Sequence, residues 1–271
     1  MAVIAINQQL GSSGVELGQD AAEKLGYRFM IGTEIIAAAA QRYNVTQEQL
    51  LIVDDRRPNF WERVRTDSAK LYCYFNATAL SEMAKDKLVL VGRTIAQNLP
   101  DVGCGLRGRA VAPFAERVKR VAADEKRAPK VAERRLRDHD REMRGRIITL
   151  SGFDLDDPGN YHLMLNVFAA PRAALVDTIC VYARYIDNSA TTAGWRAMRD
   201  TALAGQVRAA LLAHPKLGNA PMKVSCSAGV VEVIGPGLVP PWDNLVYQVG
   251  MQVQGVESVH VEDQPIEFKS A

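Results

Sequence analysis

The first residues suited to chemistry form a small loop of glycine and serine. Gly11, Ser12, Ser13 and Gly14 follow a short apolar run at 3–6 and precede an amphipathic stretch. A tight turn of such small residues can point several backbone N–H groups at one anion. A helix N-terminus behind the turn adds further N–H groups and the positive end of its dipole. The sequence therefore predicts phosphate binding at these four residues. A plain strand-to-helix turn is the alternative.

The two positions after this loop lack the side chains that usually accompany phosphate binding. In the pattern G-x-x-x-x-G-K-[ST], a lysine reaches the phosphates and a hydroxyl reaches magnesium. Val15 and Glu16 stand at these places. Phosphoryl transfer needs positive charge on the oxygens that become more negative. Any such charge must therefore come from elsewhere in the chain.

Positive charge is concentrated between residues 105 and 146. This segment has 14 Lys or Arg against seven Asp or Glu, whereas the net charge of the whole chain is only +2. A chain with so little net charge is not expected to bind nucleic acid. The basic segment is either a solvated helical face or a set of cations that meets a small polyanion, such as a nucleoside triphosphate.

Composition and cysteine spacing exclude several classes of protein. The 271 residues are 48% hydrophobic and 24% charged, and no stretch approaches the roughly 18 uninterrupted apolar residues of a membrane span. The four cysteines form no CxxC pair and the four histidines are dispersed, so we expect neither a disulfide framework nor a metal site. The start of the chain does not resemble a signal peptide. We expect a cytoplasmic protein without membrane contact.

The first 186 residues alternate between strand and helix patterns. Short continuous apolar runs are typical of strands buried on both faces of a parallel sheet. We expect strands at 3–6, 88–91, 109–114 and 161–167, and helices at 15–25, 33–43, 68–86, 115–146 (interrupted at Pro129) and 171–186. The charged segment 53–64 is expected to be a loop that leads into a helix. The predicted fold class is α/β, a parallel sheet flanked by helices.

A second, smaller unit is expected after a change in composition. Residues 187–195 are mostly small and polar, as in a linker between domains. We therefore predict domains at 1–186 and 196–271. The second shows a helix at 196–213, strands at 222–227 and 229–235, a helix at 242–253 and a strand at 257–263. This αββαβ order predicts a small α+β domain.

Five segments in order give residues 1 to about 185 a family resemblance. They are AINQQLGSSGVELGQDAAEKLGYRF, DDRRPNF, LVLVGR, VAPFAERVKRV and GFDLDDPGNYHLMLNV. Together they resemble the cytidylate kinase-like branch of the P-loop nucleoside monophosphate kinases. The resemblance implies a P-loop kinase-like sheet, ATP and magnesium as cofactors, and a (deoxy)cytidylate-like acceptor.

The resemblance also implies roles for arginines outside the loop. RDHDREMR at 137–144 is similar to the lid of these kinases, where arginines close over the phosphates. The catalytic residues implied are Arg137, Asp138, Arg141 and Arg144. Arginine suits this role because its planar fork holds phosphate oxygens in pairs. Ion pairs along an exposed helix are the alternative for each arginine.

Three further residues are implied in binding the acceptor. Arg93 matches the arginine of the family's VGRG segment. Asp54 and Asp55 lie in the segment that resembles the monophosphate-binding part, where a carboxylate can contact a ribose hydroxyl or a base amino group. Helix capping or plain solvation is the alternative for the two aspartates.

The C-terminal segments GQVRAALLAHPKLG, KVSCSAGVVEVIG and GVESVHVED resemble a BON domain, although PGLVPPWD replaces the usual polar turn. This resemblance implies a non-catalytic module for self-association or binding of a protein partner. In the loop at 235–242, Leu238 and Trp242 could each lie in the core or in an interface.

Departures from the family pattern leave two functions open. Val15 stands where the family has arginine, Thr94 where it has glycine, and His162 where it has aspartate. The first function is ATP-dependent phosphoryl transfer to a cytidylate-like acceptor. The second is a catalytically degenerate kinase fold that senses a nucleotide or assembles through its C-terminal module.

Overall fold

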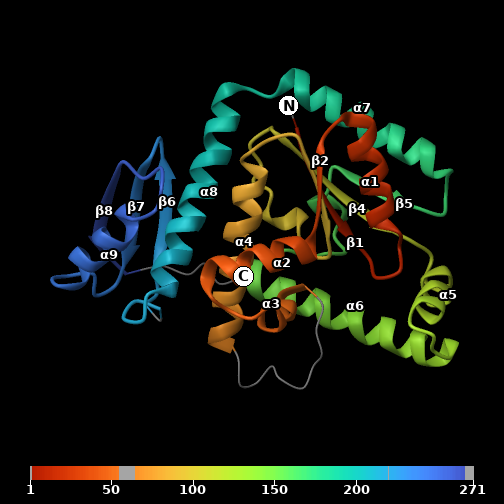
Figure 1. Cartoon of the computed structure of the whole chain (residues 1–271), viewed down its shortest axis with the longest axis horizontal. Coiled ribbons are helices and arrows are strands. Elements are labelled where there is room, and N and C mark those ends of the chain that lie inside the picture. Colours follow the sequence, from red (N-terminus) through yellow and green to blue (C-terminus); the bar gives the residue numbers. More distant parts are fainter. Residues whose placement is uncertain (1, 55–64, 219, 266–271) are drawn as a thin grey trace.

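The computed structural model describes residues 2–54, 65–218 and 220–265, and its centre is a five-stranded parallel sheet (Figure 1). The strand order is β2-β3-β1-β4-β5. The strands are β1 (Val3–Gln8), β2 (Arg28–Ile31), β3 (Leu88–Gly92), β4 (Gly105–Val111) and β5 (Leu163–Asn166). The predicted α/β class with a parallel sheet is confirmed.

Strand β1 takes the central position because its first residues are all apolar. Residues 3–6 are buried, as expected of a strand covered on both faces. β1 pairs with β3 and β4, and the register places Asn7 beside Gly92 on one side and Arg109 on the other. Parallel strands end at one edge of the sheet, where α/β proteins bind their ligands. The residues that follow β1, β3 and β4 therefore meet at this edge.

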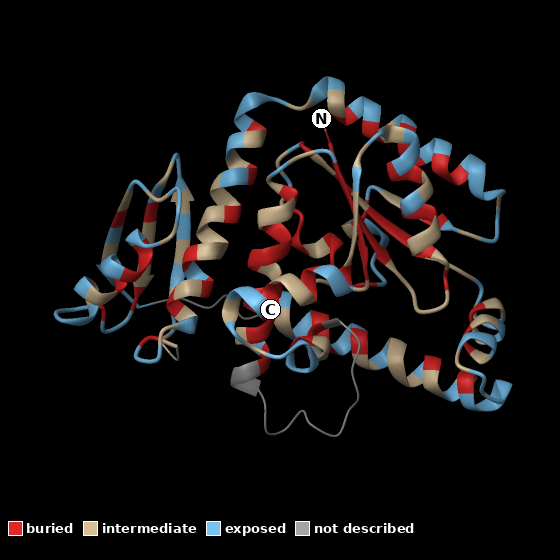
Figure 2. Cartoon of the chain, viewed as in Figure 1, coloured by how far each residue is buried: buried red, intermediate tan, exposed pale blue. Residues whose placement is uncertain are grey.

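Helices cover both faces of the sheet. Strands β1 and β3 are almost entirely buried, whereas the edge strands β2 and β5 are mostly half-buried or exposed (Figure 2). One face carries α1 (Gly14–Leu25) and α7 (Arg172–Ser189). The other carries α2 (Gly32–Tyr43), α3 (Gln47–Asp54) and α4 (Arg65–Met83). Gly18 lets α1 approach the sheet closely, because a Cβ there would lie 2.3 Å from Val91 Cγ2.

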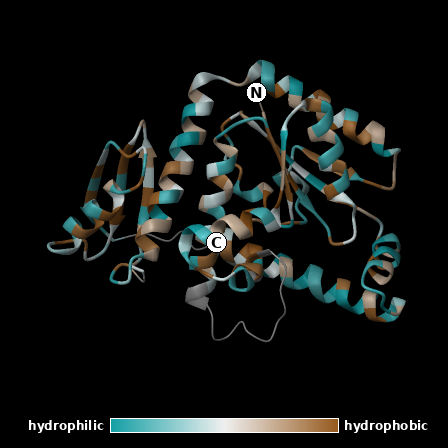
Figure 3. Ribbon diagram, viewed as in Figure 1, coloured by the Kyte–Doolittle hydropathy of each residue, from teal (hydrophilic) through white to brown (hydrophobic). Residues whose placement is uncertain are grey.

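The basic segment folds into two helices, α5 (Phe114–Asp124) and α6 (Pro129–Ser151), which are mostly hydrophilic (Figure 3). The predicted interruption at Pro129 is confirmed, since proline is tolerated in the first turn of a helix but not in its interior. The two helices contact each other through a small apolar cluster that includes Val121 and Leu136. Further along, α6 contributes Met143 to the main core. This long helix therefore joins α5 to the body of the protein.

The C-terminal unit has a separate three-stranded sheet (Figure 1). Its elements are α8 (Thr192–Ala213), β6 (Lys223–Ser227), β7 (Val230–Gly235), α9 (Trp242–Met251) and β8 (Ser258–Asp263). β6 pairs with β7 antiparallel, and β7 pairs with β8 parallel. The predicted αββαβ order is confirmed. None of the described helices is long and apolar enough to cross a membrane.

Helix α8 contributes to two hydrophobic cores. Met198, Ala202 and Ala209 belong to the core of the unit that contains the parallel sheet, where α8 packs along α4. Val207 and Leu211 belong to the core beneath the small sheet. Helix α8 is therefore part of both hydrophobic cores, and each unit buries apolar surface against it.

Several predicted elements differ from the structure. The strand expected at 109–114 is β4 at 105–111, and the chain leaves it because Pro113 caps α5. Strand β2 and helix α3 were not predicted, since neither has a clear apolar period. The expected linker contains the end of α7 and the start of α8, where Thr191 Oγ1 accepts a hydrogen bond from the Gly194 N–H (3.0 Å). The domain boundary there stays a prediction.

We expect the two units to unfold together because they share α8. Met198→Ala and Leu211→Ala each remove a fully buried side chain, from the first and the second core respectively, and each should cost roughly 2–5 kcal/mol. Both should shift the midpoint of one common transition in urea, followed by circular dichroism. The exposed Arg196→Ala is the control, with a change within about 0.5 kcal/mol. Two transitions, each responding to one variant, would contradict this expectation.

His162, which stands where the resemblance implies an aspartate, makes a specific backbone contact before β5. Its Nδ1 accepts a hydrogen bond from the Arg107 N–H (3.0 Å), and its ring stacks on Tyr182. Burial and the nearby Arg107 lower the pKa of His162. The unfolded chain therefore binds a proton at this histidine more readily than the folded protein does.

Stability should consequently fall as the pH drops through about 6.5, the value of an unperturbed histidine. His162→Asn keeps an acceptor but cannot titrate, so it should lose less stability than the wild type between pH 7.5 and 5.5. Urea denaturation at the two pH values measures this difference. The exposed His260→Asn is the matched control. The same pH dependence in all three proteins would count against the role of His162.

Candidate functional site

The glycine-serine loop connects β1 to α1 at the carboxyl edge of the sheet. Its backbone is left-handed at Gly11 (φ +79°) and at Ser13 (φ +62°). Gly14 begins α1 and lies against β1, because a Cβ there would be 2.6 Å from the Cβ of Gln8. Ser12 is fully buried, and among the described residues its Oγ has no hydrogen-bond partner. Buried hydroxyls are normally hydrogen-bonded, so this atom indicates a missing acceptor or donor at the loop.

Helix α5 packs directly on this loop. A Cβ at Gly11 would lie 3.1 Å from the carbonyl oxygen of Arg117 and 3.1 Å from Val121 Cγ2. From the same helix, Arg120 donates hydrogen bonds to Ser13 Oγ and to the carboxylate of Glu16. Glu16 is therefore neutralised by an arginine at the start of α1.

A cavity opens beside the loop at the carboxyl edge of the sheet. Its walls come from residues 8–10 at the end of β1, from the segment that follows β3 and from the loop that precedes β5. Strand β4 and helix α6 supply the remaining lining residues. Three arginines from three different segments line it, namely Arg93, Arg109 and Arg144. The lining acids are Asp140 and Asp156. Arginines converging beside a glycine-serine loop are suited to bind phosphate groups.

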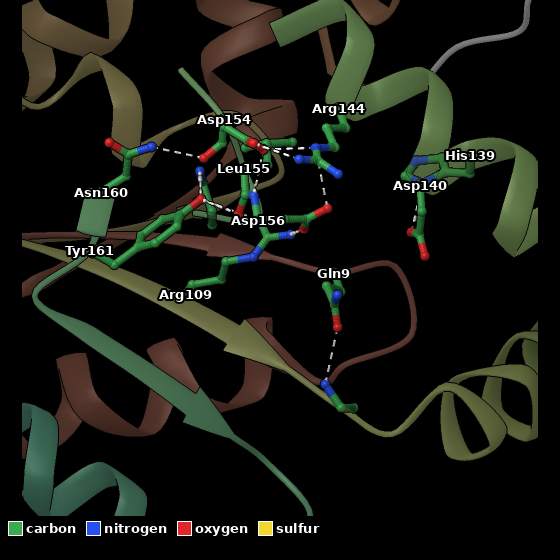
Figure 4. Close-up of polar contacts among 12 residues, drawn as sticks. Gln9, Arg109, His139, Asp140, Arg144, Asp154, Leu155, Asp156, Asn160 and Tyr161 are labelled. Atoms are coloured by element: carbon green, nitrogen blue, oxygen red, sulfur yellow. Dashed lines mark hydrogen bonds and ion pairs between the residues drawn. The ribbon is translucent and has the colours of Figure 1, made fainter. Parts of the chain in front are cut away.

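Two of the arginines of the cavity, Arg109 and Arg144, are held by carboxylates (Figure 4). Arg109, whose side chain is only 6% exposed, pairs with Asp156 (3.0 Å). Arg144 forms two hydrogen bonds to Asp154 (2.8 and 2.6 Å) and lies 3.7 Å from Asp156. The hydrogen bonds from Arg144 hold the pKa of Asp154 below its usual value. Arg109 and Arg144 are therefore both held at the cavity before any ligand binds.

The buried amide of Asn7 connects this cluster to the segment that carries Arg93. Asn7 Oδ1 accepts hydrogen bonds from the backbone N–H groups of Ile95 (2.7 Å) and Ala96 (2.8 Å). Its Nδ2 donates to the hydroxyl of Tyr161 (3.3 Å), which also contacts Arg109 (3.4 Å). One side chain at the end of β1 thus fixes the walls of the cavity relative to each other.

Comparison with known proteins agrees with this geometry. The model of the cytidylate kinase-like family matches residues 3–168. The chain belongs to the cytidylate kinase-like family. The matched residues include the loop, all five strands of the parallel sheet, and the arginines of the cavity. The match ends before the C-terminal unit, whose likeness to a BON domain stays a prediction.

Solved structures with a similar fold include kinases. An uncharacterized protein from Eubacterium ventriosum is 16% identical, with a TM-score of 0.51 over 68% of this chain and 99% of that chain. Shikimate kinase from Bacteroides thetaiotaomicron is 14% identical, with a TM-score of 0.43 over 68% and 98%. A gluconokinase from Sinorhizobium meliloti is 16% identical, with a TM-score of 0.41 over 69% and 95%. At these identities the likeness concerns the fold alone. No curated protein matches the chain.

Of the four residues that the lid resemblance implies, the structure places Arg144 at the cavity of this cytidylate kinase-like protein. Arg137 lies over the ring of Phe114 (4.6 Å to its centre) and pairs with Glu133. Asp138 and Arg141 pair with each other (2.7 Å) on α6, and Arg141 is exposed. Whether these three reach a bound nucleotide stays a prediction.

Of the three residues that the resemblance implies in binding the acceptor, the structure describes two. Arg93 lines the cavity, and its role in holding the acceptor stays a prediction. Asp54 is the last residue of α3, and Asp55 lies outside the described residues. Arg109 and Asp156 were not among the predicted site residues. An arginine inside a strand that is otherwise apolar and glycine-rich was the available signal for Arg109, since a strand between two others buries its side chains.

A magnesium site made by the protein alone is not evident. Within the residues that the structure describes, no group of three or more His, Cys, Asp or Glu could hold a metal ion. Asp140 pairs with Arg117, and Asp156 pairs with Arg109. Magnesium in proteins is commonly held by phosphate oxygens, water and one or two carboxylates. Asp140 and Asp156 are the carboxylates of this cavity that fit such a role.

The pair formed by Arg117 and Asp140 anchors α5 to α6. Arg117 is only 2% exposed, so Asp140→Asn leaves a buried cation without its counter-charge and should cost about 3 kcal/mol of folding free energy. The neighbouring Asp138→Asn should cost less than about 1 kcal/mol, because its partner Arg141 is exposed. Urea denaturation of both variants gives the comparison. Equal losses would show that Arg117 is solvated in solution.

Proposed function

We propose that this cytidylate kinase-like protein binds a nucleoside triphosphate at its glycine-serine loop and transfers the terminal phosphoryl group to a (deoxy)cytidylate-like acceptor. The observation that carries the proposal is the convergence of Arg93, Arg109 and Arg144 on one cavity beside the loop. In a reaction that moves a phosphoryl group, positioning and charge neutralisation supply most of the catalysis.

The loop suits the donor phosphates. The buried Ser12 hydroxyl lacks a partner within the described chain, and a phosphate oxygen would provide one. The N–H groups of the first turn of α1 have no carbonyl partners within the helix, as at any helix start. Gly14 keeps the loop close to β1, because a Cβ there would lie 2.6 Å from the Cβ of Gln8. These features fit ATP, whose phosphates would lie along Gly11, Ser12, Ser13 and Gly14.

The arginine-lined cavity suits the acceptor phosphate and the transferring group. Asp154 and Asp156 occupy the guanidinium forks of Arg144 and Arg109 in this structure. A phosphate presents the same kind of oxygen pair as a carboxylate, with more negative charge. A bound phosphate can therefore replace or share these partners. Magnesium, when bound, would add charge neutralisation on the donor phosphates.

A catalytically degenerate kinase fold that binds a nucleotide without efficient transfer is the second candidate. It is favoured by Val15, an apolar residue at the loop position where related sequences carry a cation. Removal of one group that stabilises charge in the transition state costs on the order of a hundred- to a thousandfold in rate. Binding depends less on that group, because the loop N–H groups remain.

Turnover and binding measured side by side separate the two candidates. Purified protein is given magnesium–ATP and a panel of nucleoside monophosphates, with diphosphate formation followed enzymatically and ATP binding by calorimetry. We expect turnover on cytidylate or deoxycytidylate. Arg144→Met should lower kcat/KM by about tenfold or more, because it removes a paired hydrogen-bond donor from the cavity. Arg134→Met, exposed on the same helix, is the control and should have no effect.

Each result has a clear meaning. Binding of ATP without turnover on any acceptor would favour the degenerate fold. A protein that binds no nucleotide would contradict both candidates. Arg141→Met belongs in the same series, because a loss there instead of at Arg144 would favour a lid that closes further than in this structure.

The C-terminal unit is proposed to mediate self-association or binding of a protein partner. Leu238 is buried in the small core, whereas Val239 (47%) and Trp242 (41%) are exposed beside it. Exposed apolar groups of this size are common at protein contacts. Mass photometry of the wild type and of Trp242→Ser tests self-association. A monomeric wild type would contradict the proposal of self-association.

A further inference from the structure

The loop of this protein lacks a cation of its own, yet a guanidinium lies on it. Residues 11–16 contain no lysine or arginine. Arg120 of α5 donates to Ser13 Oγ with one terminal nitrogen and to the Glu16 carboxylate with the other. Its Nε lies 3.7 Å from Asp124 of the same helix. The positive charge absent from position 15 is therefore present at the loop through a residue more than 100 positions away.

The position of Arg120 is fixed by the packing of its helix. The backbone of Arg117, one turn earlier, lies close to the loop, since a Cβ at Gly11 would be 3.1 Å from its carbonyl oxygen. The side chain of Arg117 is buried against Asp140. Val121, the next residue, packs on the loop at Gly11 and against α6. The backbone on both sides of Arg120 is thus held to the loop. A flexible surface arginine would have no such constraint.

The partners of Arg120 are weak enough to be exchanged. The side chains of Arg120 and Glu16 are 38% and 36% exposed, and ion pairs with this much water contribute little to stability. The nearby Ser12 Oγ is fully buried and, within the described residues, unpartnered, which is an independent sign that this loop is built for a further polar group.

We propose that Arg120 is a phosphate-binding residue of the loop, and that it takes the place of the cation that Val15 lacks. Before the ligand binds, Glu16 and Ser13 hold the guanidinium at the start of α1. When the triphosphate binds, Arg120 contacts its oxygens with the same two nitrogens. The inference rests on the proposed binding of a nucleoside triphosphate at the loop, and it names a residue that supplies the charge there.

Calorimetry with inorganic tripolyphosphate and with ATP tests the role of Arg120. Tripolyphosphate isolates the phosphate contacts from those of the base and sugar. Arg120→Ala should weaken both ligands by about tenfold or more, since it removes a charged donor pair. The affinity of Arg120→Lys should lie between those of the wild type and Arg120→Ala, because lysine keeps the charge but lacks the planar pair of donors. Lys119→Ala, which removes an equal charge from the exposed neighbouring position, is the control and should leave binding unchanged.

A rescue variant distinguishes a charge at the loop from a purely structural role. Val15→Lys in the Arg120→Ala background places a cation in the loop itself and should restore a large part of the lost affinity. A structural defect caused by loss of Arg120 would not be repaired in this way. Thermal unfolding followed by circular dichroism checks that each variant is folded.

The outcomes separate this inference from the function on which it rests. If the wild type binds neither tripolyphosphate nor ATP, the proposed function fails and the inference fails with it. If the wild type binds and Arg120→Ala binds equally well, only the inference is wrong. Tighter binding by Arg120→Ala would also overturn it, since Arg120 would then be a plug that the ligand must displace.

Discussion

The candidate site depends on the hydrogen bonds of the buried side-chain amide of Asn7. It lies at the end of the central strand, with no exposed surface, and joins the segment after β3 to Tyr161 and through it to Arg109. A buried polar side chain of this kind is costly unless its hydrogen bonds are made, so its partners are held in fixed places. The parallel register then brings Arg93 and Arg109 to the same edge of the sheet.

Four arginines at or near the candidate site form ion pairs with carboxylates. Arg109, Arg117, Arg120 and Arg144 all have carboxylate partners. This pairing explains how a basic segment can fold without repelling itself. It also gives a ligand-free site whose arginines are already oriented. A phosphate has only to take over partners, which avoids much of the cost of ordering long side chains.

Helix α8 links the family domain to the C-terminal unit. Because its two faces lie in two cores, movement of the small sheet relative to the parallel sheet would disturb the packing on α4. The small sheet is therefore coupled to α4 through α8. The domain boundary expected at 187–195 falls at the junction of α7 and α8 and stays a prediction.

The sequence by itself indicated four of the five strands of the parallel sheet, the glycine-serine loop, the basic helices and the family, but not strand β2. Each depends on local patterns, such as the apolar run of β1 or proline at the start of α6. The tertiary structure decided which charges meet. Arg109 is distant in sequence from Asp156, and Arg120 from Ser13 and Glu16, so no spacing rule could pair them. On α6, the packing against the sheet selected Arg144 for the cavity while Arg141 stayed exposed. Long-range packing, which local propensities do not encode, made these choices.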